Sequence, residues 1–234
     1  LTHDAATAIA HLNKFHPVKD YLSGLKWDGI DRLDYWLSTF CGAAHTNYTA
    51  AVGRAWLISG VARIMKPGCK ADAMIILEGE QGVRKSTALR ILGGEWFTDE
   101  LGEIGTKDAN QQVLGAWIIE MAELNQLSRA ETTRVKAFVS RSEERFRLPY
   151  ARTVETFPRS CIFAGTTNAD GGYFRDETGN RRYWPVRCCE NRNNPKIDTD
   201  GLAEVRDQLW AEATHRFLSG EKWYLVENAE TIAA

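Results

Sequence analysis

A glycine-containing loop followed by a lysine, a serine and a threonine is the part of this sequence with the clearest chemistry. It comes directly after a short apolar run and opens a segment with helical character. In such loops, glycines turn backbone N–H groups toward phosphates, the lysine reaches the β- and γ-phosphates, and the serine hydroxyl binds magnesium. We therefore predict an ATP and magnesium site, composed of Gly79, Glu80, Gln81, Gly82, Val83, Arg84, Lys85, Ser86 and Thr87.

One position of this loop departs from the usual pattern. The pattern G-x-x-x-x-G-K-[ST] requires glycine where this chain has Arg84. The strand–loop–helix context and the surviving Gly79, Gly82 and Lys85 favour a nucleotide site over the alternative, a glycine turn before an ordinary helix. The Arg84 side chain either points away from the loop or touches a phosphate.

One carboxylate ends the next strand-like segment, residues 116–120, and a second follows three residues later. A carboxylate at the end of a strand beside a phosphate loop holds magnesium through water, and a second one can orient the attacking water. We therefore assign Glu120 to the metal and Glu123 to the water. For Glu123, the alternative is a solvated helix residue.

Three further polar residues are candidates for the same reaction. Asn168 follows an apolar run and can hydrogen-bond the γ-phosphate or the attacking water, although asparagine is also a common turn residue. Arg181 and Arg182 follow a Gly-Asn turn. Paired arginines can enter a neighbouring subunit's site and neutralise charge in the transition state. The alternative is a surface pair that bridges to Asp176 or Glu177.

These residues need a fold that brings the ends of several strands together. We expect strands at 73–77, 116–120, 161–164 and 183–186, and helices from 85 to about 92, at 109–114, 129–139 and 202–218. A hairpin is expected at 146–157, confined to an edge by Pro149. The alternation implies an α/β fold, a parallel sheet with helices on both faces that binds ligands beyond the carboxyl ends of its strands.

The domain organisation follows from the same pattern. Residues 1–66 have helical periodicity and form an N-terminal helical subdomain, which ends at Pro67-Gly68. Residues 67–190 form the phosphate-loop ATPase core. Residues 191–234 form a polar linker and a C-terminal helix, which we assign to the same domain.

Composition excludes several classes of protein. The chain has 234 residues, 44% hydrophobic, and a net charge of −2, so it is not a uniformly basic nucleic-acid binder. No apolar run approaches the roughly 18 residues that cross a bilayer, and no signal peptide is recognisable, so we expect no membrane partner. The five cysteines are odd in number and lack C-x-x-C spacing, which favours a reducing cytoplasm. The chain begins without methionine, and we expect it to be a piece of a longer protein.

Taken together, these residues resemble the virulence-associated E family, which phages, prophages and genomic islands encode. The resemblance covers nearly the whole chain. It rests on an ordered set of motifs: His16-Pro-Val-Lys-Asp-Tyr-Leu22, Leu25-Lys-Trp-Asp-Gly29, Lys66-Pro-Gly-Cys-Lys-Ala-Asp72, Leu77-Glu-Gly-Glu-Gln-Gly82, Trp117-Ile-Ile-Glu-Met-Ala-Glu-Leu124, Ala164-Gly-Thr-Thr-Asn168 and Thr178-Gly-Asn-Arg-Arg-Tyr-Trp-Pro-Val186. The family is similar to superfamily 3 helicases, which are AAA+-like ring ATPases with a P-loop NTPase fold, often joined to an N-terminal primase domain.

The resemblance also implies a contact with DNA. In those helicases a hairpin between the second and third motifs grips single-stranded DNA in the channel of the ring. The matching stretch is Lys136 to Arg152. It belongs to the segment 129–152, which holds seven basic and three acidic residues inside an acidic protein. Basic groups there bind phosphates and a tyrosine stacks on bases, with a solvated charged helix and loop as the alternative. The implied contacts are Lys136, Arg145, Arg147 and Tyr150.

The resulting hypothesis is a magnesium- and ATP-dependent motor that acts on single-stranded or forked DNA as a homo-oligomer. By analogy the oligomer is a hexameric ring, in which Arg181 or Arg182 completes the neighbour's site. Two other classes stay open. An ATP-binding regulator or scaffold would use the same pocket without unwinding DNA, and a small-molecule kinase would add an acceptor pocket.

Overall fold

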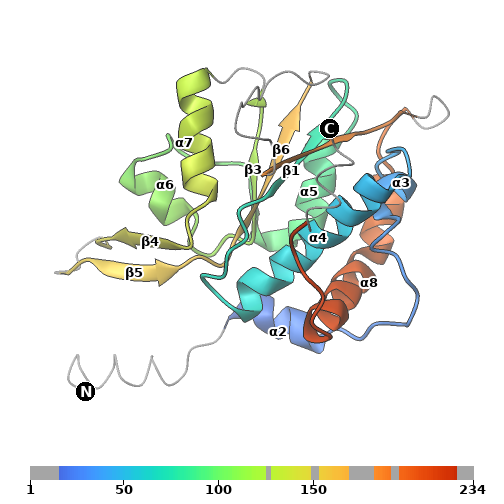
Figure 1. Ribbon diagram of the computed structural model, residues 1–234, viewed down its shortest axis with the longest axis horizontal. Coiled ribbons are helices and arrows are strands. Elements are labelled where there is room, and N and C mark those ends of the chain that lie inside the picture. The colour runs from blue at the N-terminus through green and yellow to red at the C-terminus, as the bar shows by residue number, and fades with distance from the viewer. Residues whose placement is uncertain (1–15, 125–127, 149–152, 169–181, 191–194, 226–234) are drawn as a thin grey trace.

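A five-stranded parallel sheet forms the centre of the structure (Figure 1). The computed structural model describes residues 16–124, 128–148, 153–168, 182–190 and 195–225. Its strands stand in the order β2-β3-β6-β1-β7, so that β1 lies between β6 and β7. Their bounds are β1 Met74–Glu78, β2 Phe97–Thr98, β3 Ile118–Met121, β6 Ile162–Thr167 and β7 Tyr183–Arg187. The parallel α/β class predicted from the sequence is thereby confirmed.

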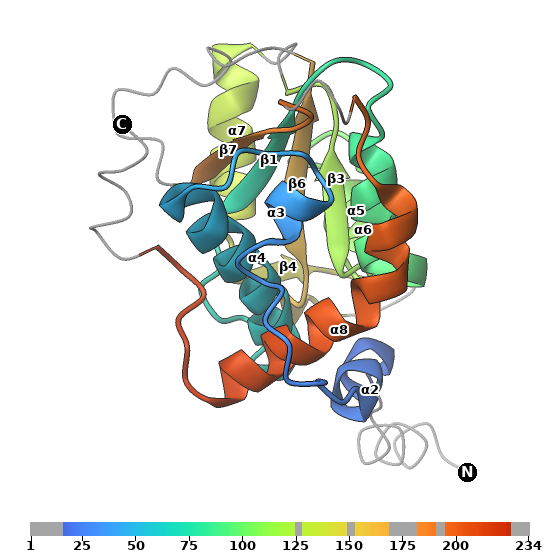
Figure 2. The same ribbon diagram turned by 90° about the vertical axis from the view of Figure 1, so that its right-hand side faces the viewer.

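Helices cover both faces of this sheet. Figures 1 and 2 show α4, α5 and α8 on one side of it and α6 and α7 on the other, as the two hydrophobic clusters also require. Two shorter helices, α2 and α3, lie against the α4 and α8 side. The bounds are α2 Pro17–Gly24, α3 Trp36–Thr39, α4 Asn47–Met65, α5 Lys85–Gly93, α6 Lys107–Gln112, α7 Arg129–Val139 and α8 Thr199–Leu218, with a 3-10 turn at Gly94–Trp96.

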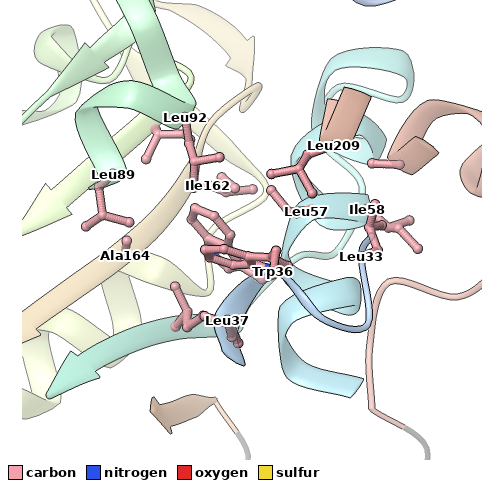
Figure 3. Close-up of a cluster of buried hydrophobic side chains, with 14 of the residues drawn as sticks. Leu33, Trp36, Leu37, Leu57, Ile58, Leu89, Leu92, Ile162, Ala164 and Leu209 are labelled. Atoms are coloured by element: carbon pink, nitrogen blue, oxygen red, sulfur yellow. The ribbon is translucent and has the colours of Figure 1, made fainter. Parts of the chain in front are cut away.

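Alternate residues of the strands supply the two cores. Ile75 and Leu77 face α4, α5 and α8, whereas Met74 and Ile76 face α6 and α7, because successive side chains of a strand point to opposite faces. All four are fully buried. In Figure 3 three leucines gather around Ile162 of β6: Leu92 of α5, Leu57 of α4 and Leu209 of α8.

Buried tryptophans link the helices on the α4 side to the sheet and to one another. The indole N–H of Trp56 in α4 donates to the carbonyl of Phe163, and that of Trp117 donates to the carbonyl of Gly60. Trp210 of α8 donates to the carbonyl of Leu92 at the end of α5. Burying one such ring contributes on the order of 4–6 kcal/mol of transfer free energy before entropy is counted. Residues 16–66 therefore share one core with the sheet and the C-terminal helix.

The predicted helices and strands agree with the structure to within a few residues, with two informative differences. The strand predicted at 161–164 continues to Thr167, because the polar end of β6 still pairs in register with Ile76, Leu77 and Glu78 of β1. Strand β2 was not predicted, since its two residues are too short to show a period. The part of the predicted N-terminal subdomain before residue 16 lies outside the described residues.

The predicted hairpin is also present, as a separate two-stranded antiparallel sheet made of β4 Glu143–Phe146 and β5 Glu155–Pro158. It begins three residues earlier than predicted because Glu144 is a buried anchor rather than a solvated charge. The Glu144 carboxylate pairs with Arg159, which also donates to the carbonyl of Phe138 at 2.6 Å. Breaking such a buried pair costs about 3–5 kcal/mol, so the hairpin is held firmly against α7.

Candidate nucleotide-binding site

The segment between β1 and α5 is a tight loop with two glycines at positive φ. Gly79 has a φ of 150° and Gly82 a φ of 84°, backbone angles that L-residues with a side chain rarely adopt. A Cβ on Gly79 would also lie 3.3 Å from the carbonyl oxygen of Cys188. The glycines thus let the chain turn directly from the strand into the helix.

Arg84 adopts the conformation for which the usual motif has glycine. It is the N-cap of α5, at φ 73° and ψ 29°, in the left-handed region. A non-glycine residue there costs roughly 1–2 kcal/mol. Its guanidinium donates to the hydroxyl of Thr199 at 2.9 Å, at the start of α8. The side chain therefore extends toward α8, and the conformation of the loop survives the loss of glycine.

This conformation makes a prediction about stability. Arg84→Gly should be more stable than Arg84→Ala by about 1 kcal/mol, because both lose the bond to Thr199 but only glycine relieves the left-handed strain. Chemical denaturation without nucleotide measures the difference. An alanine variant as stable as the glycine variant would contradict the strain argument. ATP binding by the glycine variant should stay within a few-fold of the parent.

Lys85 stands at the centre of the loop. Its side chain is 7% exposed, and its ammonium donates to the carbonyls of Gly79 and Glu80, each at 2.8 Å, and to Oδ1 of Asn168 at 3.1 Å. Burial lowers the pKa of this ammonium. A phosphate bound beside it would raise this pKa again, since an adjacent anion favours the charged form. The structure thus brings together Lys85 and Asn168, two predicted phosphate-side residues that lie far apart in the sequence.

Glu120 lies at the end of β3 and faces the loop. Its Oε1 accepts hydrogen bonds from Ser86 Oγ at 2.6 Å and from Thr166 Oγ1 at 2.7 Å. The side chain is 1% exposed, and Oε2 has no hydrogen-bond partner within the described residues. A buried carboxylate oxygen without a partner is costly unless a ligand binds it.

These residues fit a magnesium ion. Magnesium typically uses one or two carboxylates, water and substrate phosphates rather than a complete protein cage. Ser86 and Glu120 supply a hydroxyl and a carboxylate at adjacent positions. The described ranges contain no group of three or more histidine, cysteine, aspartate or glutamate side chains that would hold a metal by themselves.

A pocket of about 400 Å³ opens at this edge of the sheet, a size suited to a nucleotide's phosphates and sugar. Glu123 lies at its wall, exposed and in the left-handed region with a φ of 54°. Gly165 lets the neighbouring Leu124 side chain pack closely against β6, since a Cβ on Gly165 would lie 2.3 Å from Leu124. The lining residues are Gln81, Gly82, Arg84, Lys85, Ser86, Thr87, Ala122, Glu123, Thr166, Thr167 and Asn168.

The structure places Arg182 at the opposite edge of the sheet. It precedes β7, and its carbonyl accepts from the N–H of Met74 at the amino end of β1. The phosphate loop follows the carboxyl end of the same strand, and a five-residue strand spans roughly 16 Å. Arg182 is therefore not part of its own chain's pocket. Arg181 lies outside the described residues.

The predicted DNA contacts are only partly brought together. Arg145 and Arg147 are exposed and alternate with buried Phe146 on β4 and directly after it. Lys136 was grouped with this hairpin, but it lies in α7, with its ammonium 5.7 Å from the centre of the Tyr183 ring. The grouping was wrong because nearness in sequence does not place a helix residue on the exposed face of a strand. Tyr150 lies outside the described residues.

Sequence reasoning missed two residues that the geometry adds. Thr166 shares Oε1 of Glu120 with Ser86, and Asp72 pairs with Arg182. Both lie in motifs that were noticed as patterns, Ala164-Gly-Thr-Thr-Asn168 and Lys66-Pro-Gly-Cys-Lys-Ala-Asp72. Only the spatial pairing reveals what these two side chains contact.

Comparisons with known proteins agree with this fold. The model of the virulence-associated protein E-like domain matches residues 22–234. An apo structure of the NrS-1 C-terminal region superposes with a TM-score of 0.60 at 13% identity, covering 94% of this chain and 54% of that one. A second, of residues 305–718, gives 0.56 at 14% identity, with 86% and 48% covered.

The chain spans about half of the length of the two structures, and at such identities the likeness concerns the fold alone. A search of curated proteins finds no match. Among the described residues, no helix is long and apolar enough to cross a membrane.

Proposed function

The chain belongs to the virulence-associated protein E-like family, and on that premise we propose that it is a magnesium-dependent ATPase acting as a helicase-like DNA motor. We place this activity in the replication of a phage or another mobile genetic element. One observation carries the proposal: the buried carboxylate of Glu120 is joined to Ser86 beside the ammonium of Lys85. Phosphoryl transfer depends on positioning and charge stabilisation, and this arrangement supplies both.

Each residue of the pocket has a part in the proposed reaction. Lys85 and the loop N–H groups hold the β- and γ-phosphates, while Ser86 and Glu120 hold magnesium. When bound, the ion neutralises charge that develops on the phosphate oxygens. Asn168, already in contact with Lys85, and Glu123, at the pocket wall, orient the attacking water. The reaction cleaves the bond between the β- and γ-phosphates, with water as the acceptor.

We further propose that neighbouring copies share their sites. Arg182 lies at the sheet edge opposite its own phosphate loop, so any nucleotide that it contacts would belong to a neighbour. Arginine is suited to this task because its planar fork binds phosphate oxygens in pairs. The family resemblance favours a hexameric ring, with Arg181 as the other candidate for this task.

Removing Arg145 and Arg147 together tests the proposed action on DNA. With both changed to alanine, stimulation of ATP turnover by single-stranded DNA should be lost, while turnover without DNA stays at the parent's value. Each lost phosphate contact should also reduce the salt slope of DNA binding by about 0.7. ATP turnover with and without single-stranded DNA, alongside sedimentation, measures this.

The matched control changes two exposed lysines on another element, Lys19 in α2 and Lys26 just after it. This double variant removes the same charge and should keep full stimulation. Equal stimulation in the two double variants would contradict a DNA contact by the hairpin.

The alternative is an ATP-binding regulator or scaffold with little or no unwinding activity. The observation that favours it is Arg84, which stands at a left-handed position where the usual loop has glycine. Tight magnesium-dependent ATP binding without turnover, and without any response to DNA, would select this alternative.

A further inference from the structure

We infer that Asp72 is a positioning residue that fixes the orientation in which Arg182 reaches a neighbouring subunit's nucleotide. The inference rests on the proposed function, because it assumes that sites are shared between copies. It assigns a role to the segment Lys66-Pro-Gly-Cys-Lys-Ala-Asp72, which is remote from the chain's own pocket.

The geometry that carries the inference is an ion pair between residues 110 positions apart. Oδ2 of Asp72 accepts from Nε of Arg182 at 3.3 Å. The backbone of Arg182 is fixed as well, because its carbonyl accepts from the N–H of Met74 at 2.7 Å. Main chain and side chain of Arg182 are thus both set by the few residues that lead into β1.

The hydrogen bond with Asp72 is made through Nε of the Arg182 guanidinium. Within the described part of the chain, the Asp72 carboxylate bonds Nε and not the two terminal amino groups, which are the groups that pair with phosphate oxygens. Both residues line a pocket of about 300 Å³.

Asp72 has a second basic neighbour, Lys70. Nζ of Lys70 lies 3.8 Å from Oδ2 of Asp72, and the Lys70 carbonyl accepts from the indole N–H of Trp223 at 2.7 Å. The side chains of Asp72 and Arg182 are 21% and 34% exposed. Ion pairs exposed to this degree contribute little to folding stability. The pair is thus suited to orientation more than to holding the fold together.

Steady-state ATP turnover by the full chain tests the inference. Asp72→Ala should lower kcat roughly 10-fold with KM for ATP within about two-fold of the parent, because small misplacement of a catalytic group slows chemistry without weakening substrate binding. Asp72→Asn keeps an acceptor for Nε and should lose less. In an Arg182→Ala background, the same Asp72 change should have no further effect on kcat.

A matched ion pair serves as the control. Asp28 and Arg32 form a pair of similar exposure, 36% and 21%, far from the nucleotide pocket. Asp28→Ala should leave kcat unchanged. Thermal unfolding of each variant shows whether it is folded. If Asp72→Ala is unfolded, the effect of Asp72→Asn on kcat is compared instead, once with Arg182 present and once in the Arg182→Ala background.

Mixing experiments separate this inference from the proposed function. Asp72→Ala chains retain an intact phosphate loop, so added Lys85→Ala chains, which keep Arg182, should restore turnover. An equal loss of kcat in both Arg182 backgrounds would overturn the positioning role. An unchanged kcat in Asp72→Ala, together with a lowered kcat in Arg182→Ala, would also overturn the positioning role. The proposal of a shared site would then stand. An unchanged kcat in Arg182→Ala would instead remove Arg182 from catalysis and the inference with it.

Discussion

Replacing Lys85 with alanine is expected to abolish ATP turnover and to weaken ATP binding at least about 100-fold. The ammonium is held inside the loop by three oxygens of the loop and of Asn168, and phosphate oxygens would replace some of these as acceptors of its three N–H groups. Hydrogen bonds to charged groups are worth about 1.5–3 kcal/mol each, and two of them correspond to a factor of roughly 100 or more. Equilibrium titration with a fluorescent ATP analogue measures the loss.

Folding must be separated from binding in this experiment. Alanine at position 85 leaves the carbonyls of Gly79 and Glu80 without their partner, which costs about 1–3 kcal/mol of folding stability. Arg84→Gly is a suitable comparison, since it alters the adjacent position and should keep ATP binding. A Lys85→Ala variant that is folded and binds ATP as tightly as the parent would contradict the assignment of this loop.

The second large effect is expected for Glu120→Gln, which should lower ATP turnover by about 100-fold or more, equivalent to roughly 2.7 kcal/mol of transition-state stabilisation. Glutamine keeps an oxygen for the hydroxyls of Ser86 and Thr166. It removes the negative charge at the buried oxygen that is free of hydrogen bonds among the described residues. The expected signature is a loss of magnesium dependence rather than of nucleotide binding.

Magnesium titrations at fixed ATP concentration provide the measurement. Glu123→Gln is the informative comparison, because Glu123 lies at the pocket wall, away from the Ser86 contact. That variant should turn over more slowly with an unchanged magnesium dependence. If Glu120→Gln retained the parent's magnesium dependence and rate, the metal assignment would be wrong.

The sequence was sufficient to predict those parts of the site that depend on local pattern. Apolar runs located β1, β3 and β6, and parallel strands align their carboxyl ends at one edge. This is why Lys85, Glu120 and Asn168 were expected to meet, although they are spread over more than 80 positions. The helix at 129–139 could also be predicted from the sequence, because its capping box of Ser128 and Glu131 is a local signal.

The remaining features depend on contacts that no local pattern contains. The direction of the Arg84 side chain is decided by Thr199, which α8 brings back to the loop. The pairing of Asp72 with Arg182 depends on the alignment of β1 with β7. Lys136 was assigned to the hairpin by proximity in sequence, but the face of α7 on which it lies is set by packing against the sheet.

The two ends of β1 have a consequence for assembly. If the pocket at one end is completed by Arg182 from the other end of a neighbour's strand, contacts between copies join unlike surfaces. Such heterologous contacts either close into a ring or continue as an open filament. In an open assembly the terminal copy keeps one pocket that no neighbour completes. The specific rate of ATP turnover should therefore rise with protein concentration and level off once rings close. Dilution alone should abolish this turnover reversibly.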